Sequence, residues 1–420
     1  MRLSKTATSL VLALSLCASL HAQQPPRVYF LDAAVLGKLR ADLNSPENKQ
    51  VREQVEKFAA RAMKVGPYSV TMKERVPPSG DKHDFLSMAP YHWPDPKNPN
   101  GPYIRRDGER NPAAAKVPDR DYLADTVNAA YTLSVAYYLT GGEKYADRAA
   151  LLLRTWFLDP ATRMNPNMNH GQMITGINTG RGAGLIETRH LTRVIDALGL
   201  LAGSKSWTAT GEKGMREWLS QYLDWLQTSK NGRSEARAPN NHGSWYEQQV
   251  AVIALYLGND ALAKEIVQDR AKARIAHQIE PDGKQPLELQ RTKALHYSAF
   301  NLSALTHLAR AGDALGVDLW NFRTADGRGI RTGLDWLLPY VTDEKKFEYK
   351  QISDFEYDVI EPVLLWSALK YNEPKYADAA FKLLSLPSDI DDLVLRAAWK
   401  QKQSASRVSG AASKAQQPPQ

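Results

Sequence analysis

From residue 121 onward the sequence consists of one helical pattern after another, with no alternating strand pattern of convincing length among them. The first pattern repeats an apolar residue at every fourth position: Leu123, Val127, Tyr131, Val135 and Leu139. It ends at Gly141 and Gly142, a pair that stops a helix. The most regular apolar stripe comes later in the chain: Met215, Trp218, Leu219, Tyr222, Leu223 and Leu226. A chain of this kind buries its apolar surface by packing helix on helix.

Helical patterns fill most of the remaining chain as well. They cover residues 32–43, 50–63, 143–158, 183–202, 245–257, 260–277, 296–312, 328–340, 355–371 and 374–385. Short turns join them in pairs, and no internal repeat is visible, which argues against a tetratricopeptide-type solenoid. Longer loops alternate with tight glycine turns and carry His, Asn, Arg and Tyr residues. We therefore predict an all-α fold, an incomplete α/α toroid of helical hairpins around a central cleft, as a single domain over residues 23–400.

The two ends of the chain lack these patterns. Two basic residues and an apolar run precede Ala22, so we predict a signal peptide over residues 1–22. Leu16 is large for the position before Cys17, which argues against a lipoprotein anchor, and we expect a soluble periplasmic or secreted protein. Residues 401–420 are rich in Ser, Ala, Gln and Lys without an apolar face, and we predict a disordered tail there.

The charge of the chain favours an acidic partner. The net charge is +8, and removal of the two basic residues of the signal peptide leaves 52 basic against 46 acidic residues. A basic exported protein without nucleic-acid motifs suits an acidic polysaccharide, and we expect neither a nucleic-acid nor a membrane partner. We expect a monomer or a weak homodimer. Cys17 is the only cysteine, so the mature chain has neither disulfides nor cysteine-ligated metals.

Asn240, Asn241 and His242 stand together before Gly243, and an apolar helical pattern begins at Trp245. Polar side chains at the start of a helix are held rigidly by the helix behind them, so they suit a ligand site. The alternative is an N-cap, in which an asparagine or serine side chain accepts from the first amides of the helix. A second polar cluster, residues 291–297, opens a later helix in the same manner and contains Arg, His and Tyr.

The stretch over residues 64–118 is dense in Pro, Gly and Asn and contains Tyr91, His92, Trp93 and Tyr103. A loop of this length within one domain is either functional or disordered, and its aromatic residues argue against disorder. Such a loop can lie on the apolar faces of sugar rings, or it can simply cover the core.

These clusters contain the groups that β-elimination of a polyuronate requires. The reaction needs a group that neutralises the uronate carboxylate, a base for the C5 proton and an acid for the departing O4. Asparagine, arginine and protonated histidine suit the first role. A tyrosine near an arginine suits the other two, because the cation stabilises the phenolate and lowers the pKa of the phenol. This set is complete without a metal or a cofactor.

Hydrolysis normally requires two carboxylates that flank the bond. The candidates are Asp84, Asp95, Glu187, Glu247, Glu280, Asp282 and Glu288. No sequence pattern pairs any two of them, although Glu187 and Glu247 each lie near a polar helix start. The histidines have no metal-ligand spacing, and His190 and His307 lie in helical patterns that favour core or surface roles. Gly180, Gly182 and Gly184 follow no strand, which excludes a dinucleotide loop.

The sequence resembles the alginate lyase superfamily at three segments. These are Asn240-Asn241-His242-Gly-Ser-Trp245, the loop Ser87-Met-Ala-Pro-Tyr91-His-Trp93-Pro-Asp95, and Arg291 to Tyr297. The resemblance spans roughly residues 80–370 and is closer to polysaccharide lyase family thirty-eight than to family five. It implies an incomplete α/α toroid and a lyase that acts on a β-1,4-linked polyuronate.

The resemblance also implies roles for individual residues. Tyr297 matches the tyrosine that serves as base and acid, His242 the active-site histidine, and Arg291 the arginine that supports the tyrosine. The neutralising asparagine is either Asn241 or Asn178. The residues that we expect to bind substrate are Lys82, His83, Tyr91, His92, Trp93, Arg181, Asn240, Trp245, Glu247 and His296.

Stereochemistry leaves the substrate open. In mannuronate and glucuronate the C5 hydrogen and O4 lie on one face of the ring, so a single tyrosine serves both steps. In guluronate they lie on opposite faces, and His242 would act from the other side. We expect mannuronate-rich alginate or glucuronan. The alternatives are a glycoside hydrolase that acts on uronate oligosaccharides and a noncatalytic protein that binds acidic glycans.

Overall fold

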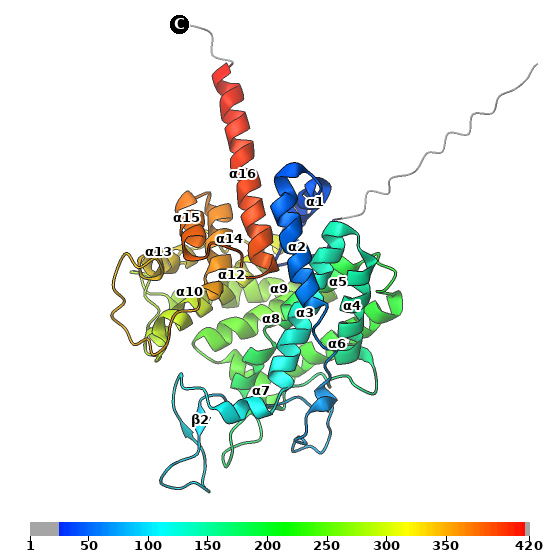
Figure 1. The fold of residues 1–420 in the computed structure, drawn as a ribbon. Helices are drawn as coiled ribbons and strands as arrows, with labels where there is room; N and C mark the ends of the chain where they lie inside the picture. The colour runs from blue at the N-terminus through cyan, green and yellow to red at the C-terminus, as the bar shows by residue number, and fades with distance from the viewer. Residues whose placement is uncertain (1–24, 416–420) are drawn as a thin grey trace, which may run out of the picture.

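The computed structural model describes residues 25–415, of which 406–415 are described only as helix backbone. The predicted signal peptide lies outside this range. The chain folds into helices packed on helices (Figure 1): α1 Ala33–Asp42, α2 Lys49–Ala62, α3 Asp119–Thr140, α4 Glu143–Leu153, α5 Leu191–Leu201, α6 Ala209–Thr228, α7 Lys230–Ala236, α8 Asn241–Leu257, α9 Asp260–Glu265, α10 Lys272–Gln278, α11 Pro286–Leu289, α12 Ala294–Leu315, α13 Ile330–Val341, α14 Glu361–Tyr371, α15 Pro374–Leu383 and α16 Ile390–Ala415. Among the described residues, no helix combines the length and the apolar character that crossing a membrane requires.

Helix α8 lies at the centre of the packing. Every residue from Gly243 to Tyr256 is buried, and the helix packs on α6 and α12. Elsewhere α3 packs on α4 and α5, and α14 packs on α15 and α16. The apolar periodicity predicts these helices because a residue on every turn faces a neighbouring helix.

Several helices differ from the sequence prediction at their ends. The pattern over 183–202 begins as a 3-10 helix, Gly182–Thr188, before α5. The pattern over 260–277 contains a π-helical segment, Ile266–Ala271, between α9 and α10. Helix α8 begins at Asn241, four residues before the predicted start at Trp245. The Asn241–His242 pair therefore belongs to the first turn of α8 and not to the loop before it.

The long loops of the sequence contain short strands. Strand β1 (Leu86–Met88) pairs in parallel with β4 (His170–Met173), and β2 (His92–Trp93) pairs antiparallel with β3 (Ile104–Arg105). These strands have two to four residues each, which is too short for an alternating pattern to be recognised. The pairing of β1 with β4 joins the aromatic loop to the segment that precedes α5.

Residues 401–415 continue α16 as helix, over a part of the chain for which the sequence predicts a disordered tail. Figure 1 shows α16 extending away from the other helices toward its C-terminal end. Ile390, Val394 and Trp399 are buried, and the Lys402 ammonium donates to the Leu369 carbonyl at 2.7 Å. A helix that packing has already nucleated continues through Ala, Lys and Gln, which are good helix formers.

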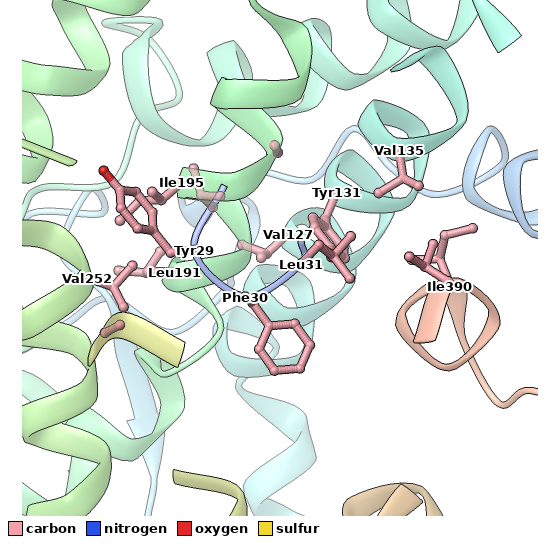
Figure 2. Close-up of a cluster of buried hydrophobic side chains, with 14 of the residues drawn as sticks. Tyr29, Phe30, Leu31, Val127, Tyr131, Val135, Leu191, Ile195, Val252 and Ile390 are labelled. Atoms are coloured by element: carbon pink, nitrogen blue, oxygen red, sulfur yellow. The ribbon is translucent and has the colours of Figure 1, made fainter. Parts of the chain in front are cut away.

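The N-terminal segment enters the core without a strand partner (Figure 2). The Asp196 carboxylate accepts from the amides of Tyr29, Phe30 and Leu31 at 2.7, 3.0 and 3.2 Å. The Arg310 guanidinium donates to the carbonyls of Phe30 and Leu31 at 3.0 and 3.1 Å. Two charged side chains thus satisfy backbone groups that would otherwise be buried without partners.

Candidate active site

One cavity of about 990 Å³ lies between the helix ends and the aromatic loop. Most of the predicted site residues line it: Tyr91, His92, Arg181, Asn240, Asn241, His242, Trp245, Arg291, His296 and Tyr297. These side chains come from the loop after β1, the segment after β4, the start of α8 and the start of α12. Five predicted residues are not part of its lining: Lys82, His83, Trp93, Asn178 and Glu247.

Two buried carboxylates hold the Asn241–His242 pair. The Asn241 amide nitrogens of backbone and side chain both donate to the Glu288 carboxylate, each at 2.7 Å. The His242 Nδ1 lies 2.5 Å from Glu235 Oε1, and Glu235 is 4% exposed. With Nδ1 directed at a carboxylate, the imidazole presents Nε2 on its other side. Burial raises the pKa of Glu288, and the hydrogen bonds from Asn241 counteract part of that effect.

The alternative N-cap interpretation does not hold at this helix. Asn240 occupies the N-cap position and its side chain makes no capping hydrogen bond. The Ser244 hydroxyl donates to Gln278 Oε1 at 2.9 Å, and Asn241 binds Glu288 instead of the first helical amides. The Oδ1 of Asn241 is buried without a hydrogen-bond partner among the described residues. The polar pair therefore serves the cavity, because capping does not account for it.

Tyr297 also lines the cavity and hydrogen-bonds to the aromatic loop. Its hydroxyl donates to the Tyr91 hydroxyl at 3.0 Å. The guanidinium carbon of Arg291 lies 3.7 Å from the centre of the Tyr297 ring. Arg291 in turn donates to the Asp107 carboxylate through Nη2 at 2.8 Å and Nε at 3.1 Å. The loop and the start of α12 are thus joined at the tyrosine.

The pKa of Tyr297 is raised, so the prediction that Arg291 lowers it below its ordinary value is wrong. Burial is the main cause, the neighbouring Tyr91 adds to it, and Arg291 only counteracts part of the effect. The guanidinium stacks on the ring and shares its charge with Asp107. Although burial alone would raise the pKa of Asp107, hydrogen bonds from Arg291 and Thr292 hold it well below its usual range. The phenol of Tyr297 is therefore protonated in the free protein.

The aromatic loop contributes Tyr91 and His92 to the cavity, but its other predicted residues bind elsewhere. The Trp93 Nε1 donates to the Glu109 carbonyl at 2.9 Å, and its ring packs under Arg106. The His83 Nδ1 lies 2.6 Å from the Arg163 carbonyl. Lys82 is exposed outside the cavity. The β2–β3 pairing turns Trp93 onto the backbone of its own loop, whereas His83 contacts the segment around Arg163 and Lys82 faces outward.

The segment over 165–182 contributes Arg181, whereas Asn178 lies outside the cavity. Asn178 Oδ1 accepts from the Ile174 amide at 3.2 Å and closes a local turn. Arg181 Nη2 donates to Gln172 Oε1 at 2.6 Å. Gln172 has a φ of 50°, an unusual backbone conformation for a residue with a side chain. Its amide donates to the Ser87 hydroxyl at 2.8 Å, which fixes this conformation next to the cavity.

Glu187 and Glu247, the carboxylates that the sequence favours for hydrolysis, do not lie opposite each other across a space that could hold the bond to be cleaved. Glu247, for which we predicted a substrate contact, accepts from Arg274 Nη2 at 2.9 Å and is not part of the cavity lining. Glu187 lines the cavity and accepts from the Ser87 hydroxyl at 2.5 Å. Burial raises the pKa of Glu187 to about 7, although the bond from Ser87 counteracts it. The two do not flank a common space.

The structure adds cavity residues that the sequence patterns did not reveal. They are Arg105, Arg120, Asn128, Gln172, Arg189, His190, Arg193, Lys293 and His307. Arg189, His190 and Arg193 lie at or near the start of α5, where charged residues interrupt an apolar pattern; that interruption was the only signal in the sequence. Over the described part of the chain, no group of three or more His, Cys, Asp or Glu side chains is arranged to hold a metal ion.

Comparisons with known proteins give a matching family model and similar solved structures. A model of the alginate lyase family matches residues 69–347. An alginate lyase from Bacteroides ovatus is 39% identical in sequence, with 88% of this chain and 99% of that chain covered and a TM-score of 0.83. No curated protein matches the chain.

Two more distant structures share the fold at 16% identity. Alginate lyase A1-III from Sphingomonas species A1 has a TM-score of 0.51, with 79% of this chain and 86% of that chain covered. A histidine-to-alanine variant of alginate lyase A1-III complexed with a tetrasaccharide has a TM-score of 0.56, with 87% and 98% covered. Alginate lyases of this kind have an α/α toroid, which confirms the predicted fold. The chain belongs to the alginate lyase family and is a polysaccharide lyase.

Proposed function

We propose that this protein cleaves a β-1,4-linked polyuronate by β-elimination, with mannuronate-rich alginate or glucuronan as its substrate. The observation that carries the proposal is that Asn241, His242 and Tyr297 line one cavity. The relative complexed with a tetrasaccharide supports an oligosaccharide in this cavity. Within the family, we propose that the chain is nearest to polysaccharide lyase family thirty-eight. The Asn240-to-Trp245 element and the Tyr91 loop support this proposal.

The first task of the site is to neutralise the uronate carboxylate. We assign it to Arg181 and Asn241 in preference to Asn178, because the Asn178 side chain closes a local turn. Arg181 makes no ion pair with any described carboxylate, and its Nε is buried without a partner. Hydrogen bonds from these groups strengthen as negative charge moves onto the carboxylate when the C5 proton leaves.

On mannuronate or glucuronate, Tyr297 takes the C5 proton and then gives a proton to O4. The C5–H electron pair becomes the C4=C5 double bond, the C4–O4 bond breaks, and the new chain end has an unsaturated uronate. Because the phenol is protonated at rest, Tyr297 must first release its proton to water, after which the Tyr91 hydroxyl at 3.0 Å can donate a hydrogen bond to the phenolate. Turnover by this route therefore increases with pH.

A second candidate substrate is guluronate, and the His242–Glu235 contact at 2.5 Å favours it. A carboxylate on Nδ1 fixes the tautomer and stabilises the imidazolium, as in other histidine bases. His242 would then take the C5 proton from one face of the ring. Tyr297, already protonated, would donate to O4 from the other face.

Ultraviolet absorbance of the conjugated product tests the proposal. Purified protein is incubated separately with polymannuronate, glucuronan and polyguluronate. Growth of absorbance on polymannuronate or glucuronan supports the first assignment, and growth on polyguluronate alone supports the second. Chain shortening without new absorbance indicates a hydrolase, and binding without shortening indicates a capture protein.

Export to the periplasm or the medium is part of the proposal and rests on residues 1–22, so a protein found only in the cytoplasm would contradict it.

A further inference from the structure

The cavity has a second cationic region, around Arg189. This residue lies between the 3-10 helix Gly182–Thr188 and α5. Its guanidinium donates to the Ile186 carbonyl at 3.1 Å and lies 5.3 Å from the centre of the Phe300 ring. It is only partly exposed and lines the cavity.

Arg189 differs from its arginine neighbours because it makes no ion pair with a described carboxylate. Arg193 pairs with Asp389 and Asp391 at 2.8 and 2.7 Å. Arg120 pairs with Asp121 at 2.9 Å. A guanidinium that lacks a counter-charge in a partly enclosed cavity raises the free energy of the protein, because it has lost part of its hydration. Binding of an anion lowers that free energy.

The surroundings of Arg189 increase that cost. Burial, and next the charge of Arg120, lower the pKa of Arg189 to about 10, so it stays charged at neutral pH. Glu187 is near enough to counteract this effect, but its own pKa is raised to about 7 and its carboxylate bonds to Ser87. The charge of Arg189 is thus only partly compensated within the protein.

Neutral donors and aromatic rings adjoin this region. Trp245 packs on Phe300 with ring centres 5.0 Å apart, and its Nε1 is buried without a hydrogen-bond partner among the described residues. The hydroxyl of Thr306, another lining residue, is also buried without one. Aromatic surface, unpaired donors and a cation together suit a sugar that carries a carboxylate.

The position fits a sugar unit next to the cleaved bond. Phe300 follows Tyr297 by three residues on α12, so the two lie on one face of the helix and roughly 5 Å apart along its axis. We propose that Arg189, Trp245, Phe300 and Thr306 form a further uronate subsite, in which Arg189 binds the carboxylate of a neighbouring sugar unit. This inference rests on the proposed function, because it takes the substrate to be a polyuronate.

Binding to an inactive protein tests the subsite separately from catalysis. In a Tyr297→Phe background, Arg189→Gln and Arg189→Lys are compared by calorimetry with a saturated uronate tetrasaccharide and with a neutral β-1,4-mannan tetrasaccharide. We expect Arg189→Gln to weaken uronate binding on the order of 10- to 100-fold, since a hydrogen bond to a charged group is lost. We expect neutral binding to change little and Arg189→Lys to recover part of the loss.

Arg163→Gln is the matched control, because Arg163 is exposed and is not part of the cavity lining. Equal losses for Arg189→Gln and Arg163→Gln would overturn the proposal, since only general charge attraction would then remain. Equal losses on the uronate and the neutral tetrasaccharide would also overturn it, because they indicate a structural role. If the wild-type protein produced no absorbance growth on any of the three polyuronates, that result would instead contradict the proposed function, whatever the binding result.

Discussion

At the scale of single residues, the side chains that face the cavity depend on partners distant in the sequence. Asn241 is held by Glu288, and Arg291 by Asp107, 47 and 184 residues away. Motif and resemblance placed Asn241, His242, Arg291 and Tyr297 together, because each belongs to a short local pattern. The partners were not predicted, since a carboxylate that binds across the fold has no local pattern. The raised pKa of Tyr297 was missed for the same reason, because burial comes from the assembled fold.

On polyguluronate, where His242 takes the C5 proton, Glu235→Gln should lower turnover on the order of 100-fold, because the amide neither stabilises the imidazolium of His242 nor fixes its tautomer as a carboxylate does. Substrate binding should change little, since Glu235 bonds to His242 at 2.5 Å and is not part of the cavity lining. Initial rates of absorbance growth measure kcat and KM. Glu217→Gln, at an exposed position on α6, is the control. Unchanged kcat in Glu235→Gln would show that this contact has no part in the reaction.

At the scale of elements, helices were predicted better than their ends. Apolar periodicity identifies a helix, but the first turn of α8 is polar and is buried by contacts from α7 and α11. The short strands β1 to β4 arise from pairings between distant loops, which periodicity does not report. Helix α16 continues past its buried portion because its composition favours helix, although the same composition indicated disorder.

The contact of the N-terminal segment with α12 should make stability depend on pH. His307 stacks on Phe30 with ring centres 4.2 Å apart, and burial together with Arg193, Arg310 and Arg189 lowers the pKa of His307 to about 3. The unfolded chain therefore binds a proton at this residue between pH 6.5 and 3 that the folded chain does not, and stability is lost as pH falls through that range.

His307→Gln should remove this dependence. The free energy of unfolding of the wild-type protein should fall more between pH 7 and pH 4 than that of the variant, by about 3 kcal/mol. Urea unfolding at both pH values, followed by circular dichroism, measures the difference. His277→Gln, at an exposed position on α10, is the control. If the free energy of unfolding fell equally between pH 7 and pH 4 in the wild type and in His307→Gln, the pH dependence could not be attributed to His307.

At the scale of the whole molecule, both ends of the described chain bind to helices from the middle of the sequence. The N-terminal segment binds Asp196 on α5 and Arg310 on α12, and α16 binds α3 and α5 through Asp391. The sequence predicted the architecture because helix packing determines it, and the comparisons confirm that prediction. The contacts of the N-terminal segment were not predicted, since residues 27–31 are too few for a pattern.

Asp391→Ala should destabilise the protein by roughly 2 to 4 kcal/mol, because it removes a buried partner of both Arg193 and Tyr131. Arg193 retains Asp389, which limits the loss. Denaturant unfolding measures the change, and Asp378→Ala on the exposed face of α15 is the control. A loss no larger than that of the control would show that α16 is not fixed through this carboxylate.

Elimination at Tyr297 is the central claim, and one substitution tests it most directly. Tyr297→Phe removes the hydroxyl that donates to Tyr91 and keeps the ring beneath Arg291. Absorbance growth on the preferred polymer should fall by at least about 10²-fold, as expected for loss of an acid–base group, while calorimetric binding of a uronate tetrasaccharide persists. A Tyr297→Phe protein with wild-type absorbance growth would contradict the account.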